Sequence, residues 1–156
     1  MTTMTTSCGS TPTRERRWLG LAGLVPFLAC LAVLVLAEDP WVRQTASQTM
    51  QHYAAVIAAF LGAVHWGIAA AAVDDGTQPA RLRWGVTPAL LSWALLALPA
   101  NAALLGYAVL FVLILVVDLY LLPALDDDYR ALRRPLTAVV VATLALAALA
   151  TPASGV

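Results

Sequence analysis

Five long apolar runs, separated by short gaps, occupy most of this 156-residue chain. Hydrophobic residues make up 61% of the sequence and charged residues only 12%. A soluble domain of this length would not contain so many long apolar stretches. We therefore expect most of this chain to lie in a lipid bilayer. The pattern therefore predicts an all-α integral membrane protein, a single domain with five transmembrane helices.

The runs also give the expected spans. At about 1.5 Å per residue, a run of about 20 residues covers the roughly 30 Å of hydrocarbon in a bilayer. The segment after Pro88 is too short to cross, so we expect the third helix to begin before this proline and to kink there. Pro99-Ala100-Asn101 is a tight turn before the fourth run. The expected spans are about residues 18–37, 53–73, 81–98, 102–122 and 136–150, between a polar tail (1–17) and a short C-terminal tail (151–156).

Two of these boundaries have a second interpretation. The fifth run is short, and Asp126 or Asp127 can cap a helix that begins earlier, with carboxylates at the positive helix end. The first run ends in Val35-Leu36-Ala37, which resembles a signal-peptidase site. Its apolar stretch is longer than the roughly 7–15 residues of a signal-peptide core, so we expect an uncleaved span.

The basic residues predict the orientation, and all nine are arginines. Eight lie in the N-terminal tail, the second-to-third gap and the fourth-to-fifth gap: Arg14, Arg16, Arg17, Arg81, Arg83, Arg130, Arg133 and Arg134. Only Arg43 lies on the other side. Positively charged loops stay in the cytoplasm, so the N-terminus is predicted to be cytoplasmic and the C-terminus periplasmic. The net charge is zero, which gives no indication of a nucleic-acid partner.

Tryptophans fall at two kinds of position. Trp18, Trp41 and Trp84 lie at predicted membrane interfaces, where amphipathic rings are favoured. Trp66 and Trp93 do not, so we expect both to pack between helices.

The second span has a face of small residues. Ala55, Ala58, Gly62 and Ala69 fall in one narrow stripe at 100° per residue, flanked by His65 and Trp66. Small residues let helix backbones approach closely in membranes. The stripe is a candidate helix-packing face, and it predicts that His65 points toward protein rather than lipid.

His65 and Asp118 are the only ionisable candidates inside the spans. Polar groups at membrane depth are costly, so each is a functional-site hypothesis. Their expected depths differ by about one helical turn. In one interpretation the Asp118 carboxylate bonds a His65 ring nitrogen, and the pair relays protons. In the other, His65 donates to a neighbouring carbonyl while Asp118 reaches the headgroups or an arginine.

We expect no catalytic, cofactor-binding or metal-binding residues. His52 and His65 are about 20 Å apart along one helix, so they cannot ligate the same iron. The sequence holds no haem-attachment motif, metal-ligand spacing, phosphate-binding glycine loop or nucleophilic triad.

The chain resembles a known family of uncharacterised proteins, the domain of unknown function 3429, which includes the transmembrane protein 69-like proteins of mitochondria. The resemblance covers about residues 18–150 and rests on Gly23-Leu24-Val25-Pro26-Phe27, Tyr53-Ala54-Ala55-Val56-Ile57, Phe60-Leu61-Gly62-Ala63-Val64-His65-Trp66-Gly67, Asp118, Tyr129-Arg130-Ala131-Leu132-Arg133 and Leu136-Thr137. It implies a small multi-pass protein of the bacterial cytoplasmic (inner) membrane with about five helices. It implies no activity.

Three functions remain open. We expect a non-enzymatic structural or assembly partner of other membrane proteins, or of further copies of itself, because packing faces outnumber intramembrane polar groups. The alternative is a small proton-linked transporter that uses His65 and Asp118, although five spans give no inverted repeat. The third is a redox or quinone-binding protein, which would use Trp66, Tyr107 and His65.

Overall fold

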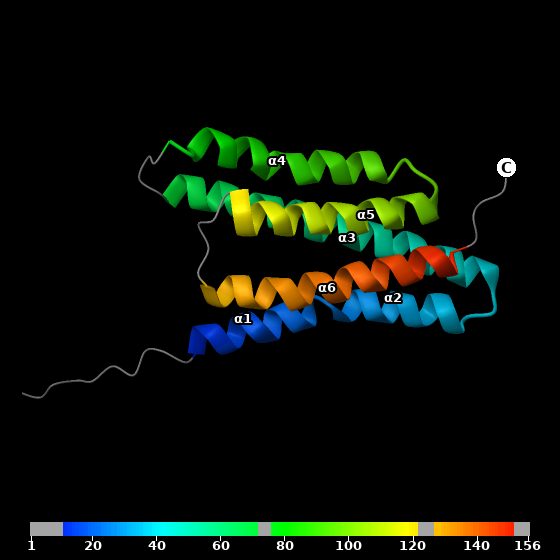
Figure 1. The fold of residues 1–156 in the computed structure, drawn as a ribbon. Coiled ribbons are helices and arrows are strands. Elements are labelled where there is room, and N and C mark those ends of the chain that lie inside the picture. The colour runs from blue at the N-terminus through cyan, green and yellow to red at the C-terminus, as the bar shows by residue number, and fades with distance from the viewer. Residues whose placement is uncertain (1–10, 72–75, 122–126, 152–156) are drawn as a thin grey trace, which may run out of the picture.

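The computed structural model describes residues 11–71, 76–121 and 127–151, and every regular element within them is a helix. The prediction of an all-helical fold is therefore confirmed. Figure 1 shows a bundle in which successive helices run in opposite directions from α2 onward. The elements are α1 (Thr11–Ala22), α2 (Val25–Leu36), α3 (Pro40–Ala71), α4 (Gln78–Leu95), α5 (Ala100–Val116), the π-helix η1 (Val117–Leu121) and α6 (Asp127–Ala150).

The two ends of the bundle carry different charge. α1, α4 and α6 all begin at the same end in Figure 1, and their first two turns carry the eight arginines that were assigned to one side. We call this the arginine-rich end. α3 begins at the opposite end and carries Arg43 there. The helices thus gather the arginines as the sequence pattern requires.

The first apolar run forms two helices rather than one. Regular helix stops at Gly23 and Leu24, just before Pro26, which lacks a backbone N–H and lies in the first turn of α2. The Tyr53 hydroxyl of α3 donates to the Gly23 carbonyl oxygen at 3.0 Å, so a neighbouring helix caps the break. Residues Arg17–Leu36 together remain long and apolar enough to cross a membrane.

α3 begins at Pro40 rather than at residue 53. The intervening residues are polar, so the apolar pattern marked only the part of the helix that lipid would accept. Proline suits a first helical turn, and the Asp39 carboxylate accepts a hydrogen bond from the Trp41 amide at 2.8 Å. α3 ends at Ala71, and the last two residues of the predicted span lie outside the described residues.

Four helical segments of the described chain, not five, are long and apolar enough to cross a membrane: Arg17–Leu36, Pro40–Ala71, Ala100–Tyr120 and Arg130–Ala150. The predicted span that falls short is the third, residues 81–98, which corresponds to α4. α4 ends at Leu95 and holds Arg81 and Arg83 in its first turns, so its apolar part is short. Pro88 lies inside α4, and the kink expected there stays a prediction.

The remaining boundaries differ by a few residues. The turn expected at 99–101 lies at residues 96–99, and Ala100 already belongs to α5. α5 and η1 cover the predicted fourth span as far as residue 121. α6 begins at Asp127, before the predicted span and in agreement with the second interpretation of this boundary, and it ends at Ala150. The expected cap by Asp126 or Asp127 lies outside the described side chains.

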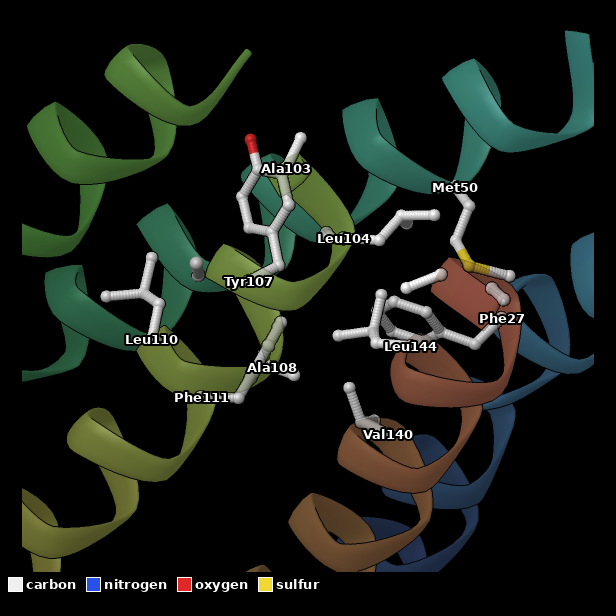
Figure 2. Packing of buried hydrophobic residues seen from close by; sticks show 14 of the residues in the cluster. Phe27, Met50, Ala103, Leu104, Tyr107, Ala108, Leu110, Phe111, Val140 and Leu144 are labelled. Atoms are coloured by element: carbon white, nitrogen blue, oxygen red, sulfur yellow. The ribbon is translucent and has the colours of Figure 1, made fainter. Parts of the chain in front are cut away.

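The core lies where α2, α3, α5 and α6 meet (Figure 2). Phe27 packs edge-on against Tyr53 and Phe111, with ring centroids 5.0 and 6.1 Å apart. Large hydrophobic side chains also cover the outside, among them Phe60, Leu90 and Val109. Such a surface is costly in water and favourable in hydrocarbon, which fits a bundle whose outer faces meet lipid.

Candidate functional site

The small-residue face of α3 packs toward the protein. Ala58, Gly62 and Ala69 are buried, and Ala55 is partly buried against the core. A Cβ atom at Gly62 would lie 2.7 Å from the Gly85 carbonyl oxygen of α4, which is closer than real Cβ atoms approach. Gly62 therefore permits the close contact between α3 and α4.

The two tryptophans expected between helices behave differently. Trp66 is half exposed, but its ring covers Gly85 and its indole N–H donates to the Leu82 carbonyl oxygen at 3.0 Å. It is therefore a packing residue at the edge of the α3–α4 contact. The expectation is wrong for Trp93, which is 76% exposed, because α4 ends two residues later and places this ring in its last turn.

His65 lies on the same face of α3 and is fully buried. Its Nε2 lies 2.9 Å from Oδ1 of Asp118, which belongs to η1. The structure therefore brings together the two ionisable residues that the sequence analysis singled out.

Asp118 lies in a π-helix, the five-residue segment Val117–Leu121. A π-turn inserts one extra residue and changes the direction of the side chains that follow, and such turns are frequent at functional sites. The Arg130 guanidinium of α6 donates to the Leu119 carbonyl oxygen at 3.5 Å, a long contact at the edge of this segment. The π-turn thus places a buried carboxylate between α3 and α6.

Arg133 of α6 completes a three-residue cluster. Its Nε and Nη2 atoms donate to Oδ2 of Asp118 at 3.1 and 2.8 Å, and its side chain is buried. We call His65, Asp118 and Arg133 the polar cluster. Each of its members comes from a different helix, so the cluster joins α3, η1 and α6.

The sequence analysis counted Arg133 among the charges of the fourth-to-fifth gap and among the residues of the family resemblance, and it left open that Asp118 reaches an arginine without saying which one. A signal for it was present, because Arg133 begins a helical stripe that continues through Thr137, Val140 and Leu144, all buried. The predicted span began at residue 136, and the earlier helix start was considered only for its cap, so this stripe was not used. An arginine on the inward face of a membrane helix calls for a buried anion, and Asp118 is that anion.

The charges of the cluster follow from its geometry. Arginine is permanently charged, and two donors from one guanidinium match a carboxylate. An ionised Asp118 can only accept, so the His65 Nε2 atom carries the proton of a neutral imidazole and donates it. The His65 Nδ1 atom has no hydrogen-bond partner among the described residues.

Residues considered for cofactors lie apart. No group of three or more His, Cys, Asp or Glu side chains that could hold a metal occurs in the part of the chain that the structure describes. His52 is exposed on α3, away from the buried His65. Tyr107 is buried and points toward α4 in Figure 2, where its hydroxyl donates to the Ser92 carbonyl oxygen at 2.8 Å. The Tyr107 hydroxyl is thus hydrogen-bonded within the core.

Comparison with known proteins places the chain in a family. The family model "Protein of unknown function (DUF3429)" matches residues 12–149, and the chain belongs to this family. No curated protein and no solved structure matches the chain significantly. The likeness to transmembrane protein 69-like proteins stays a prediction.

Proposed function

We propose that this member of the DUF3429 family is a non-enzymatic, multi-pass protein of the bacterial cytoplasmic membrane that serves as a structural or assembly partner of other membrane proteins. The observation that carries this proposal is the polar cluster. Both Asp118 oxygens are engaged, one by His65 and the other by Arg133. The intramembrane charges are therefore used to hold helices together rather than to face a substrate path.

The proposed topology has five crossings, with the arginine-rich end in the cytoplasm. α4 is less apolar than the other spans, but its 18 residues reach about 27 Å, close to the thickness of the hydrocarbon layer. It packs along α3 with its buried Arg81, Gly85 and Ser92 on the protein side. A helix that shields its polar residues in this way needs less apolarity than one surrounded by lipid.

The outer surface supports a binding role. Phe60 and Leu90, on the neighbouring helices α3 and α4, are more than 60% exposed, and Val56 is similarly exposed one turn from Phe60. In a membrane these side chains meet lipid or the helix of a partner. Exposed large hydrophobic side chains occur on all six α-helices and supply such packing surface.

Proton-linked transport is the second candidate, and the His65 Nδ1 atom favours it. This atom is a buried proton acceptor without a partner among the described residues. Against a relay, both oxygens of Asp118 are already engaged within the bundle, one by His65 and the other by Arg133. A redox or quinone-binding role has less support, because the Tyr107 hydroxyl is bonded within the core.

Purification from native membranes tests the proposal. The tagged protein, extracted in mild detergent, should retain a membrane protein at constant stoichiometry. Phe60→Ala and Leu90→Ala change the exposed surface and leave the polar cluster intact, so these variants should lose a specifically bound partner but not proteins captured non-specifically. If the wild type purifies alone and drives proton flux in liposomes that Asp118→Leu abolishes, the transporter is correct and the assembly role is wrong.

A further inference from the structure

A cavity of about 570 Å³ lies at the end of the bundle opposite the polar cluster. It is formed where α2 and α6 end and where α3 and α5 begin, and its lining includes Leu34, Glu38, Arg43 and Leu149. Its volume falls within the roughly 300–1,000 Å³ of small-molecule sites. Trp41, largely exposed, lies two residues from Arg43, as expected of a ring at headgroup depth.

Two opposite charges line this cavity without pairing. The Arg43 Nη2 atom donates to the Ala150 carbonyl oxygen at 2.7 Å, and the other N–H groups of Arg43 have no partner among the described residues. No ion pair joins Arg43 to Glu38 in the described chain, although both side chains line the same cavity. The cavity therefore presents a donor-rich cation and a separate carboxylate.

These groups match a zwitterion attached to an apolar chain. A phosphate needs several N–H donors, which a guanidinium supplies, and a primary ammonium needs an acceptor such as a carboxylate. Gln44, also in the lining, adds an amide donor beside Arg43. Leu149, with Pro40 and Ala100, supplies apolar surface for an acyl chain.

We infer that this cavity binds the headgroup of a phospholipid of the phosphoethanolamine type, with the phosphate at Arg43 and the ammonium at Glu38. A lipid with only an anionic headgroup would place no cation near Glu38. A purely apolar ligand would cover the partly buried Arg43 guanidinium without replacing its water contacts. This inference requires that the protein resides in a membrane, but it does not depend on the assembly role.

Native mass spectrometry of the full chain tests the inference, after release from nanodiscs that contain equal amounts of phosphatidylethanolamine, phosphatidylglycerol and phosphatidylcholine. The wild type should retain phosphatidylethanolamine preferentially. Glu38→Gln should reduce its preference over phosphatidylglycerol by at least roughly threefold, and Arg43→Gln should weaken the retention of all three lipids. Adding soluble O-phosphoethanolamine separates a lipid site from a headgroup-only site, because it should not displace the lipid.

Matched controls keep the test decisive. Glu15→Gln and Arg83→Gln alter exposed charges near the arginine-rich end and should change nothing. Glu38 is exposed and Leu149 is 83% exposed, so Glu38→Gln and the cavity-filling Leu149→Trp test the site even if Arg43→Gln fails to fold. Equal retention of the three lipids by the wild type, unchanged retention in Glu38→Gln, or displacement by the soluble headgroup would each overturn the inference.

Discussion

At the scale of single residues, Asp118 holds the most consequential position, because two buried side chains depend on it. Replacing Asp118 with leucine removes the carboxylate that accepts two hydrogen bonds from the buried Arg133 and one from His65. Replacing His65 leaves the ion pair between Asp118 and Arg133 intact. The geometry thus ranks the three residues by their expected contribution to stability. A histidine–aspartate pair alone would give no such ranking.

The first prediction is this ranking. We expect Asp118→Leu to lower the free energy of unfolding most, by roughly 3–5 kcal/mol, then Arg133→Leu, and His65→Leu least. The double change Asp118→Leu/Arg133→Leu should cost less than the sum of the single changes, because each single change removes the same ion pair. Denaturation in detergent measures all of these variants.

Arg134→Leu is the matched control, since Arg134 is the exposed neighbour of Arg133. Equal losses for Arg133→Leu and Arg134→Leu, or strictly additive losses within the cluster, would show that the three residues do not act together.

A second prediction concerns Tyr53. Tyr53→Phe keeps the ring against Phe27 but removes the hydroxyl that caps the Gly23 carbonyl, so it should cost about 1 kcal/mol of stability. Tyr120→Phe removes a hydroxyl from an exposed ring and should have no effect. Thermal melts compare the two variants, and the same melting temperature for both would mean that the cap adds no stability.

At the scale of helices, the close contact between α3 and α4 depends on Gly62. Gly62→Leu should force the helices apart and cost about 1–3 kcal/mol, with a lower yield of folded protein. Ala63→Leu, one residue along and exposed, should be tolerated. Size-exclusion profiles of the two variants provide the measurement. A normal profile for Gly62→Leu would exclude this packing face.

The sequence predicted helices well where lipid dictates composition and poorly where it does not. The apolar runs located α2, the second half of α3, α5 and most of α6. They missed the start of α3 at Pro40, because its first turns are largely polar, whereas the early start of α6 was anticipated from the acidic residues near Asp127. They also missed Arg133, whose role depends on a helix start and a π-turn that hydrophobic periodicity does not encode. His65 was found because an ionisable group in an apolar run stands out in any sequence.

At the scale of the whole molecule, the number of membrane crossings depends on α4. If α4 crosses the membrane, the chain makes five crossings and its termini lie on opposite sides. If only the four more apolar helices cross, the termini lie on the same side. The eight arginines at one end of the bundle favour five crossings, with that end in the cytoplasm.

Paired reporter fusions at the two termini measure this directly. Green fluorescent protein, which fluoresces only in the cytoplasm, and alkaline phosphatase, which is active only in the periplasm, are fused in turn to each end. With five crossings and a cytoplasmic N-terminus, we expect fluorescence from the N-terminal fusion and phosphatase activity from the C-terminal fusion. Fluorescence from both ends would mean an even number of crossings and would contradict the five-span bundle.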